Sequence, residues 1–181
     1  SDITGAKALT KMPNLFKYQN EEGKYINYWA ITSEGAPILE SFADIADKTC
    51  MGIDLSWYDG KNNYTLSEAE DLYGFAVLAT GMTFENETIT LDKDITINEG
   101  DSKTWATEAP KYQWNPIGVV DNSTYTVFKG VFDGNEHTIS GLYVNAVYNR
   151  AGLFGEIGSS SQIKNLKLEN MKKLLLGAAL A

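Results

Sequence analysis

The sequence has very little of the two side chains that most often build zinc and redox sites. Its single cysteine, Cys50, cannot form an intramolecular disulfide or a cysteine-based zinc site. Its single histidine, His137, cannot make a typical zinc site or a Ser-His-Asp triad without help from elsewhere. Calcium-loop, phosphate-loop and G-x-S-x-G patterns are also absent. We therefore expect no metal site, no cofactor and no catalytic residue, which indicates that the chain is not an enzyme.

Positive charge and long apolar runs are scarce as well. The 15 Lys and Arg stand against 24 Asp and Glu, for a net charge of -9, and no Lys/Arg cluster interrupts the acidic balance. Most faces would repel a polyanion, so we expect no nucleic-acid partner. The one terminal apolar run is far too short to cross a bilayer, which takes ~20 apolar residues. We expect no membrane insertion.

That terminal run, residues 171–181, reads MKKLLLGAALA. It resembles the first residues of a secretory signal, but it stands at the wrong end of the chain to act as one. Its composition favours a short helix, which could cover the open end of a repetitive fold. The alternative is a segment foreign to the native protein. The chain begins at Ser1 rather than at a methionine, which is compatible with removal of a native start and any signal peptide.

The first part of the chain is mixed in character. Residues 24–31 are rich in aromatic and β-branched side chains and predict a strand. Apolar residues between 38 and 46 recur at nearly helical spacing and predict a short amphipathic helix. A clearer helix is predicted near residues 67–80, with Thr65 or Ser67 as its N-cap and Gly81 at its C-terminal end. Its apolar stripe consists of Ala69, Leu72, Tyr73, Ala76 and Leu78.

After Gly81 the pattern changes to short β-rich runs separated by turn residues. No long helical pattern lies between these runs, which excludes a doubly wound α/β sheet. Two mainly β architectures stay open on this evidence: an antiparallel sandwich, or a solenoid whose strands stack on those of the preceding coil.

Three stretches favour the solenoid: FKGVFDGNEHTISGL at 128–142, AGLFGEI at 151–157 and IKNLKLEN at 163–170. In this order they resemble the GLUG-motif repeats of bacterial surface proteins. The resemblance covers about residues 56–170 and implies a right-handed parallel β-helix within large, exported, adhesin-like proteins. Residues 1–55 then form a lead-in segment, which resembles the end of a preceding repeat unit, and residues 171–181 stand apart from the repeat.

The chain departs from the family pattern in two ways. Glu136 stands where the family has glycine, so the turn must either avoid a positive φ or bear strain. Only one clear copy of the repeat is present, although solenoids usually need several coils. Apolar repeat residues are expected to point inward and stack in ladders: Phe128, Phe132, Ile139, Leu142, Leu153, Phe154, Ile157, Ile163, Leu166 and Leu168.

Aromatic residues are the best candidates for ligand binding. Trp105 and Tyr112 lie in a loop-like stretch and are predicted to be exposed platforms for sugar rings or protein partners. Trp114 belongs to the repeat-like motif and is predicted to be core. His137 and nearby Asp133 are interpreted as structural parts of the motif. The carboxylate pairs, such as Asp92 with Asp94, are interpreted as a solvated acidic edge.

Taken together, these features predict a non-enzymatic, extracellular or bacterial cell-surface module, either adhesin-like or a structural stalk. Its expected partners are host or matrix glycans or proteins. End-to-end self-association is also expected, near Lys172, Lys173 and the leucines after them. The alternatives are a bare spacer, a carbohydrate-active β-helix domain, or an accessory domain of a large secreted peptidase. A carbohydrate-active domain would need carboxylates gathered in one groove, at least one with a raised pKa.

Overall fold

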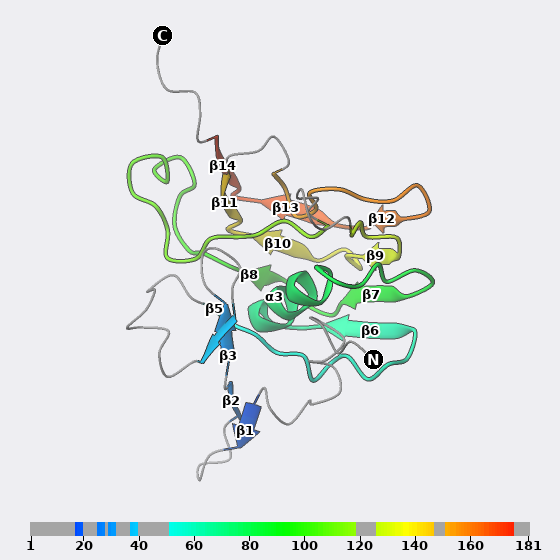
Figure 1. The fold of residues 1–181 in the computed structure, drawn as a ribbon. Coiled ribbons are helices and arrows are strands. Elements are labelled where there is room, and N and C mark those ends of the chain that lie inside the picture. The colour runs from blue at the N-terminus through cyan, green and yellow to red at the C-terminus, as the bar shows by residue number, and fades with distance from the viewer. Residues whose placement is uncertain are drawn as a thin grey trace.

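The computed structural model describes residues 17–19, 25–27, 29–31, 37–39, 51–118, 126–146 and 151–175. Figure 1 shows two kinds of sheet, small antiparallel ones from the start of the chain and a stack of parallel strands from the rest. The described part contains one α-helix of ten residues, α3. The chain is therefore mainly β.

Within the described residues, the antiparallel part contains five short strands. β1 (Lys17–Gln19) pairs with β2 (Tyr25–Asn27), and β3 (Trp29–Ile31) pairs with both β4 (Pro37–Leu39) and β5 (Met51–Gly52). The predicted strand at residues 24–31 is thus found as two strands. The predicted helix is wrong for Ile38 and Leu39, because pairing with β3 outweighs a weak local pattern. Its remaining residues, and Cys50, lie outside the described part.

The parallel part is a β-solenoid of about three turns. Its first sheet has the order β12-β9-β7-β6, its second β13-β10-β8 and its third β11-β14. Every pairing within these sheets is parallel. The strands are β6 (Asn63–Leu66), β7 (Thr88–Leu91), β8 (Ile95–Thr96), β9 (Val131–Asp133), β10 (Thr138–Ser140), β11 (Tyr143–Ala146), β12 (Gln162–Lys164), β13 (Lys167–Glu169) and β14 (Lys172–Leu175). The predicted solenoid is confirmed.

Register between coils places like residues above one another. In the first sheet Ile89 stands next to Phe132, and in the second Ile95 stands next to Ile139. All four side chains are at most 2% exposed. Because side chains alternate between the two faces of a strand, the residues between them point outward to solvent. Inward stacking is also confirmed for the predicted residues Phe128, Leu142 and Leu153.

Helix α3 (Ala69–Leu78) closes one end of the solenoid, as the sequence predicts. Its N-cap is Glu68 rather than Thr65 or Ser67, because the Asp71 carboxylate accepts the backbone N–H groups of Ser67 and Glu68, at 2.8 and 3.1 Å. The helix buries Leu72, Phe75 and Leu78 completely against the core. Its C-cap is Ala79, two residues before Gly81.

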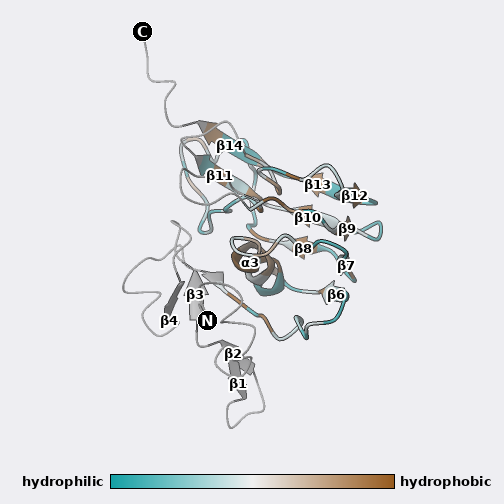
Figure 2. Ribbon diagram, turned by 45° about the vertical axis from the view of Figure 1, so that its right-hand side comes forward, coloured by the Kyte–Doolittle hydropathy of each residue, from teal (hydrophilic) through white to brown (hydrophobic). Residues whose placement is uncertain are grey.

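The opposite end carries the last coil, β12, β13 and β14, and no other described element lies beyond it in Figures 1 and 2. The expected helix within residues 171–181 is wrong for 172–175, which form β14 in parallel register with β11. Ladder residues of this coil were expected to be buried, yet Ile157, Ile163 and Leu168 are 47%, 36% and 39% exposed. Each of them pairs with a buried residue of the preceding coil, namely Phe128, Phe132 and Ile139, but no described coil covers their other side.

Candidate functional site

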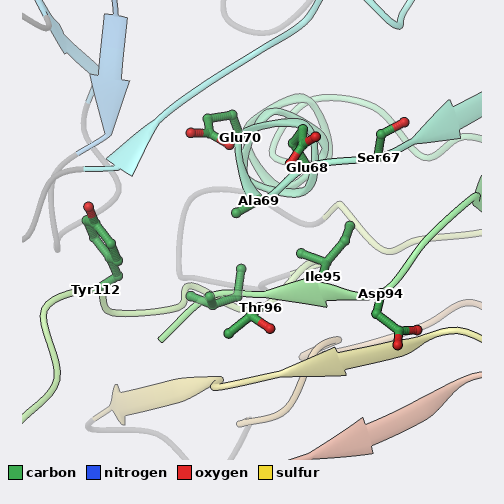
Figure 3. A pocket seen from close by; sticks show the side chains of 9 residues that line it. Ser67, Glu68, Ala69, Glu70, Asp94, Ile95, Thr96 and Tyr112 are labelled. Atoms are coloured by element: carbon green, nitrogen blue, oxygen red, sulfur yellow. The ribbon is translucent and has the colours of Figure 1, made fainter. Parts of the chain in front are cut away.

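A surface groove lies between the beginning of α3 and strand β8 (Figure 3). Its volume is about 310 Å³, the lower end of the range for small-ligand sites. Its lining combines carboxylates, hydroxyls and one aromatic ring. The lining residues are Ser67, Glu68, Ala69, Glu70, Asp94, Ile95, Thr96, Ile97 and Tyr112.

The groove follows from the way the helix meets the sheet. In β8 and the residue after it, Ile95 and Ile97 are buried while Thr96 is exposed, which is the alternation of a strand that covers a core. The Thr96 hydroxyl lies 3.0 Å from the Ser140 hydroxyl on neighbouring β10. Across the groove, the N-cap of α3 contributes Glu68 and its first turn contributes Glu70, as Figure 3 shows.

Two carboxylates of the groove, those of Glu68 and Asp94, are exposed and each lies beside a basic side chain. Glu68 forms an ion pair with Lys93. Asp94 accepts the backbone N–H of Thr138 at 2.9 Å and lies 3.3 Å from Nδ1 of His137. The Thr138 N–H holds the pKa of Asp94 below its ordinary value, with a smaller contribution from His137. Asp94 therefore stays ionised at neutral pH.

Tyr112 is half-buried at the end of the groove and is held there through its backbone. Its N–H donates to Oδ1 of Asn98 at 2.8 Å, and its carbonyl accepts from Nδ2 of the same side chain at 2.7 Å. Asn98 is only 5% exposed, and its Nδ2 also donates to the Gly141 carbonyl at 2.9 Å. The Nζ atom of Lys111 lies 4.6 Å from the centre of the Tyr112 ring, in cation–π geometry.

Asn98 is a positioning residue that the sequence did not reveal. Its bonds to Tyr112 and Gly141 cross 14 and 43 residues of chain, so no local pattern marks them. The available signal was weak: an asparagine at the end of an alternating β run, just before an acidic residue and a glycine.

The prediction that Trp105 is an exposed platform is wrong. Its side chain is 3% exposed and meets the Tyr143 ring edge-on, with centroids 6.2 Å apart. The loop that carries it is fixed by Asn170 of the last coil, which accepts from the Ser102 N–H at 2.8 Å and donates to the Gly100 carbonyl at 2.6 Å. This anchor folds the indole back onto the solenoid. Trp105 does not line the groove.

Other residues considered in the sequence analysis make contacts that hold the fold together, and they do not line the groove. Trp114 is fully buried, as predicted, and its Nε1 donates to the Leu153 carbonyl at 3.2 Å. Asp133 accepts Nδ2 of Asn165 at 3.0 Å and so connects two coils, while His137 faces Asp94 rather than Asp133. The pKa of Glu87 is raised by burial, but Glu87 does not line the groove.

The parts of the chain that the structure describes contain no group of three or more residues placed to hold a metal ion. Over the same residues, no helix has the length and apolar character needed to cross a membrane.

Fold and groove together define a parallel β-solenoid with a helical cap and an acidic, aromatic-edged surface groove. A segment of the chain is similar to halomucin from Haloquadratum walsbyi, with 41% identity over 69 residues. That match covers 36% of this chain and 1% of halomucin, so the chain corresponds to a very small part of that protein. No protein-family model matches the chain, and no solved structure matches it.

Proposed function

We propose that this chain is a non-enzymatic, extracellular β-solenoid module that binds glycans in the groove between α3 and β8. The observation that carries the proposal is Tyr112, which stands at the groove with its backbone clamped on both sides by Asn98. An aromatic ring packed partly against the core, beside exposed carboxylates and hydroxyls, suits sugars, whose rings have an apolar face and a rim of hydroxyl groups. Because the Tyr112 backbone is already anchored, little backbone freedom is lost on binding.

The charges of the groove select among glycans. Glu68, Glu70 and Asp94 are hydrogen-bond acceptors, which suit sugar hydroxyl and amino groups. The same charges repel sulfated and uronic-acid sugars. We therefore infer that the ligands are neutral or amino sugars on a host or matrix surface.

The surface location has separate support. The similarity to a segment of halomucin, a surface-associated protein, supports an extracellular location. The GLUG-like stretches support an exported, adhesin-like protein. A solenoid suits this role because its coils form a rigid shaft with an extended outer surface.

A glycan-array screen of the intact 181-residue chain, followed by titration of the best ligand, tests the proposal. Tyr112→Ala should weaken binding at least about tenfold, which equals ~1.4 kcal/mol, whereas Tyr112→Phe should keep most of it. Asp94→Asn should weaken binding, whereas Asp92→Asn, next to the groove but outside its lining, serves as the matched control.

Three results would contradict the proposal. The absence of saturable binding to any neutral or amino sugar would favour the bare-spacer alternative. Binding that Tyr112→Ala leaves unchanged would place the ligand elsewhere. Cleavage of the bound oligosaccharide would identify a carbohydrate-active domain, although the lowered pKa of Asp94 makes this residue a poor general acid.

A further inference from the structure

The last coil of the solenoid presents unpaired strand edges together with exposed apolar side chains. All three sheets end on this coil, in β12, β13 and β14, and each of these strands pairs with a described strand on one side only (Figure 2). Large apolar side chains are exposed here: Ile157 at 47%, Ile163 at 36%, Leu168 at 39% and Met171 at 36%. An edge of this kind is a template for pairing with another strand.

Strand β13 is complementary to itself when two copies run antiparallel. Its three residues are Lys167, Leu168 and Glu169. Leu168 pairs with buried Ile139 of β10, so its side chain is on the face of the strand that points toward the core. Lys167 and Glu169 flank it on the outward face. The two charged side chains form an ion pair of 2.6 Å, which places them together along the outer edge.

We infer that this coil is a self-association surface whose occupant is a second copy of the chain. The two β13 strands pair antiparallel about a twofold axis through Leu168. This register sets the Leu168 side chains opposite each other, and each Lys167 faces Glu169 of the second copy. Opposite charges at facing positions stabilise a strand pair, and like charges destabilise it.

Charge and topology both disfavour other arrangements of two copies. Parallel in-register pairing of two β13 strands would set Lys167 against Lys167 and Glu169 against Glu169. Head-to-tail stacking would bring the open coil against the other end of the solenoid, where α3 runs beside β8. A twofold contact between the open ends avoids both difficulties, and it forms a closed dimer rather than a filament.

This inference does not depend on the proposed function, but it has a consequence for it. The groove lies at the β8 edge of the sheet whose opposite edge is β13, with β10 between these two strands. Dimerisation through β13 therefore leaves both grooves open to ligand. Two sites on one rigid particle would raise the apparent affinity for a surface that carries many copies of the same glycan.

Sedimentation equilibrium of the intact chain over a wide concentration range tests the inference, with circular dichroism as the check on folding. The wild type should dimerise. Lys167→Glu alone, or Glu169→Lys alone, sets like charges opposite each other and should weaken the dimer at least about tenfold. Lys167→Glu combined with Glu169→Lys should restore it, and an equimolar mixture of the two single variants should form a heterodimer.

Both changed side chains are exposed, so the variants should fold like the wild type. A wild type that stays monomeric at high concentration would overturn the inference and leave the coil edge open to a different strand. A dimer that both single variants leave intact would also overturn it. Glycan titration tests the groove and sedimentation equilibrium tests the dimer, so either proposal can fail while the other stands.

Discussion

Gly141 and Gly60 form a matched pair for measuring how tightly the coils of this solenoid pack. Both have a backbone φ of +79°. Alanine at either site therefore bears the same left-handed strain, about 1–2 kcal/mol, and a stiffer unfolded chain offsets about 0.4–1 kcal/mol of it. The sites differ in their surroundings: nothing lies within 4 Å of an added Cβ at Gly60, whereas at Gly141 it would lie 2.2 Å from the Asn98 carbonyl oxygen.

Gly60→Ala should consequently lower the free energy of unfolding by about 1 kcal/mol. Gly141→Ala should lower it by about 3 kcal/mol, because overpacking of a close contact adds about 1–3 kcal/mol. The contact is with backbone atoms, and the Asn98 nitrogen lies 2.5 Å from the same Cβ position, so no side-chain rotation can relieve it. Urea unfolding followed by circular dichroism measures both changes.

Equal decreases in the free energy of unfolding for the two variants would refute this reasoning, since they would mean that the Asn98 backbone moves aside at no cost. The pair also tests the groove. A displaced Asn98 would misplace Tyr112, so Gly141→Ala should weaken glycan binding in the folded state, whereas Gly60→Ala should not.

Three further changes have defined outcomes. Glu136→Gly should stabilise the chain by about 0.5–1 kcal/mol, seen as a rise of about 1–4 °C in Tm, because Glu136 has a φ of 65°; a lower Tm would contradict this. Asn98→Ala should lower the unfolding free energy by about 1–3 kcal/mol, and an unchanged urea midpoint would show that water replaces its bonds. Hydrogen bonds from the Asn135 N–H and, second, from the Asn165 side chain lower the pKa of Asp133 below its ordinary value of 3.8. Ionised Asp133 therefore stabilises the folded chain above pH 3.8, and this stabilisation is lost as the pH falls through the lower pKa of the folded state. Asp133→Asn should flatten the acid limb of the stability curve, and an unaltered limb would contradict the assignment.

The sequence predicted the repeating interior well because that interior is locally encoded. Phe132 and Ile139 each stand in a strand with outward neighbours on both sides, and glycines mark the corners between strands. Glu136 departs from the glycine of the repeat pattern, and its positive φ shows that the turn keeps the shape for which glycine is the easier residue.

What the sequence could not provide depends on contacts between distant residues. The indole of Trp105 is buried because Asn170 holds its loop, across 68 and 70 residues of chain. Residues 172–175 carry good helix formers, yet they extend because β11 offers a parallel strand edge. The exposure of Leu168 depends on whether another coil covers it, which no property of the strand itself expresses.

The groove and the cap have a common physical origin. Strands in a solenoid lie about 4.7–4.9 Å apart, whereas a helix with its side chains is about 10–12 Å across. When α3 takes the place of a strand beside β8, its larger diameter prevents close contact along the whole edge, and a channel results between the two elements. The residues on either side of that channel are the polar first turn of the helix and the outward face of the strand. A helical cap on a β-solenoid therefore produces a polar groove at the capped end, and in this chain Asn98 fixes an aromatic ring beside it.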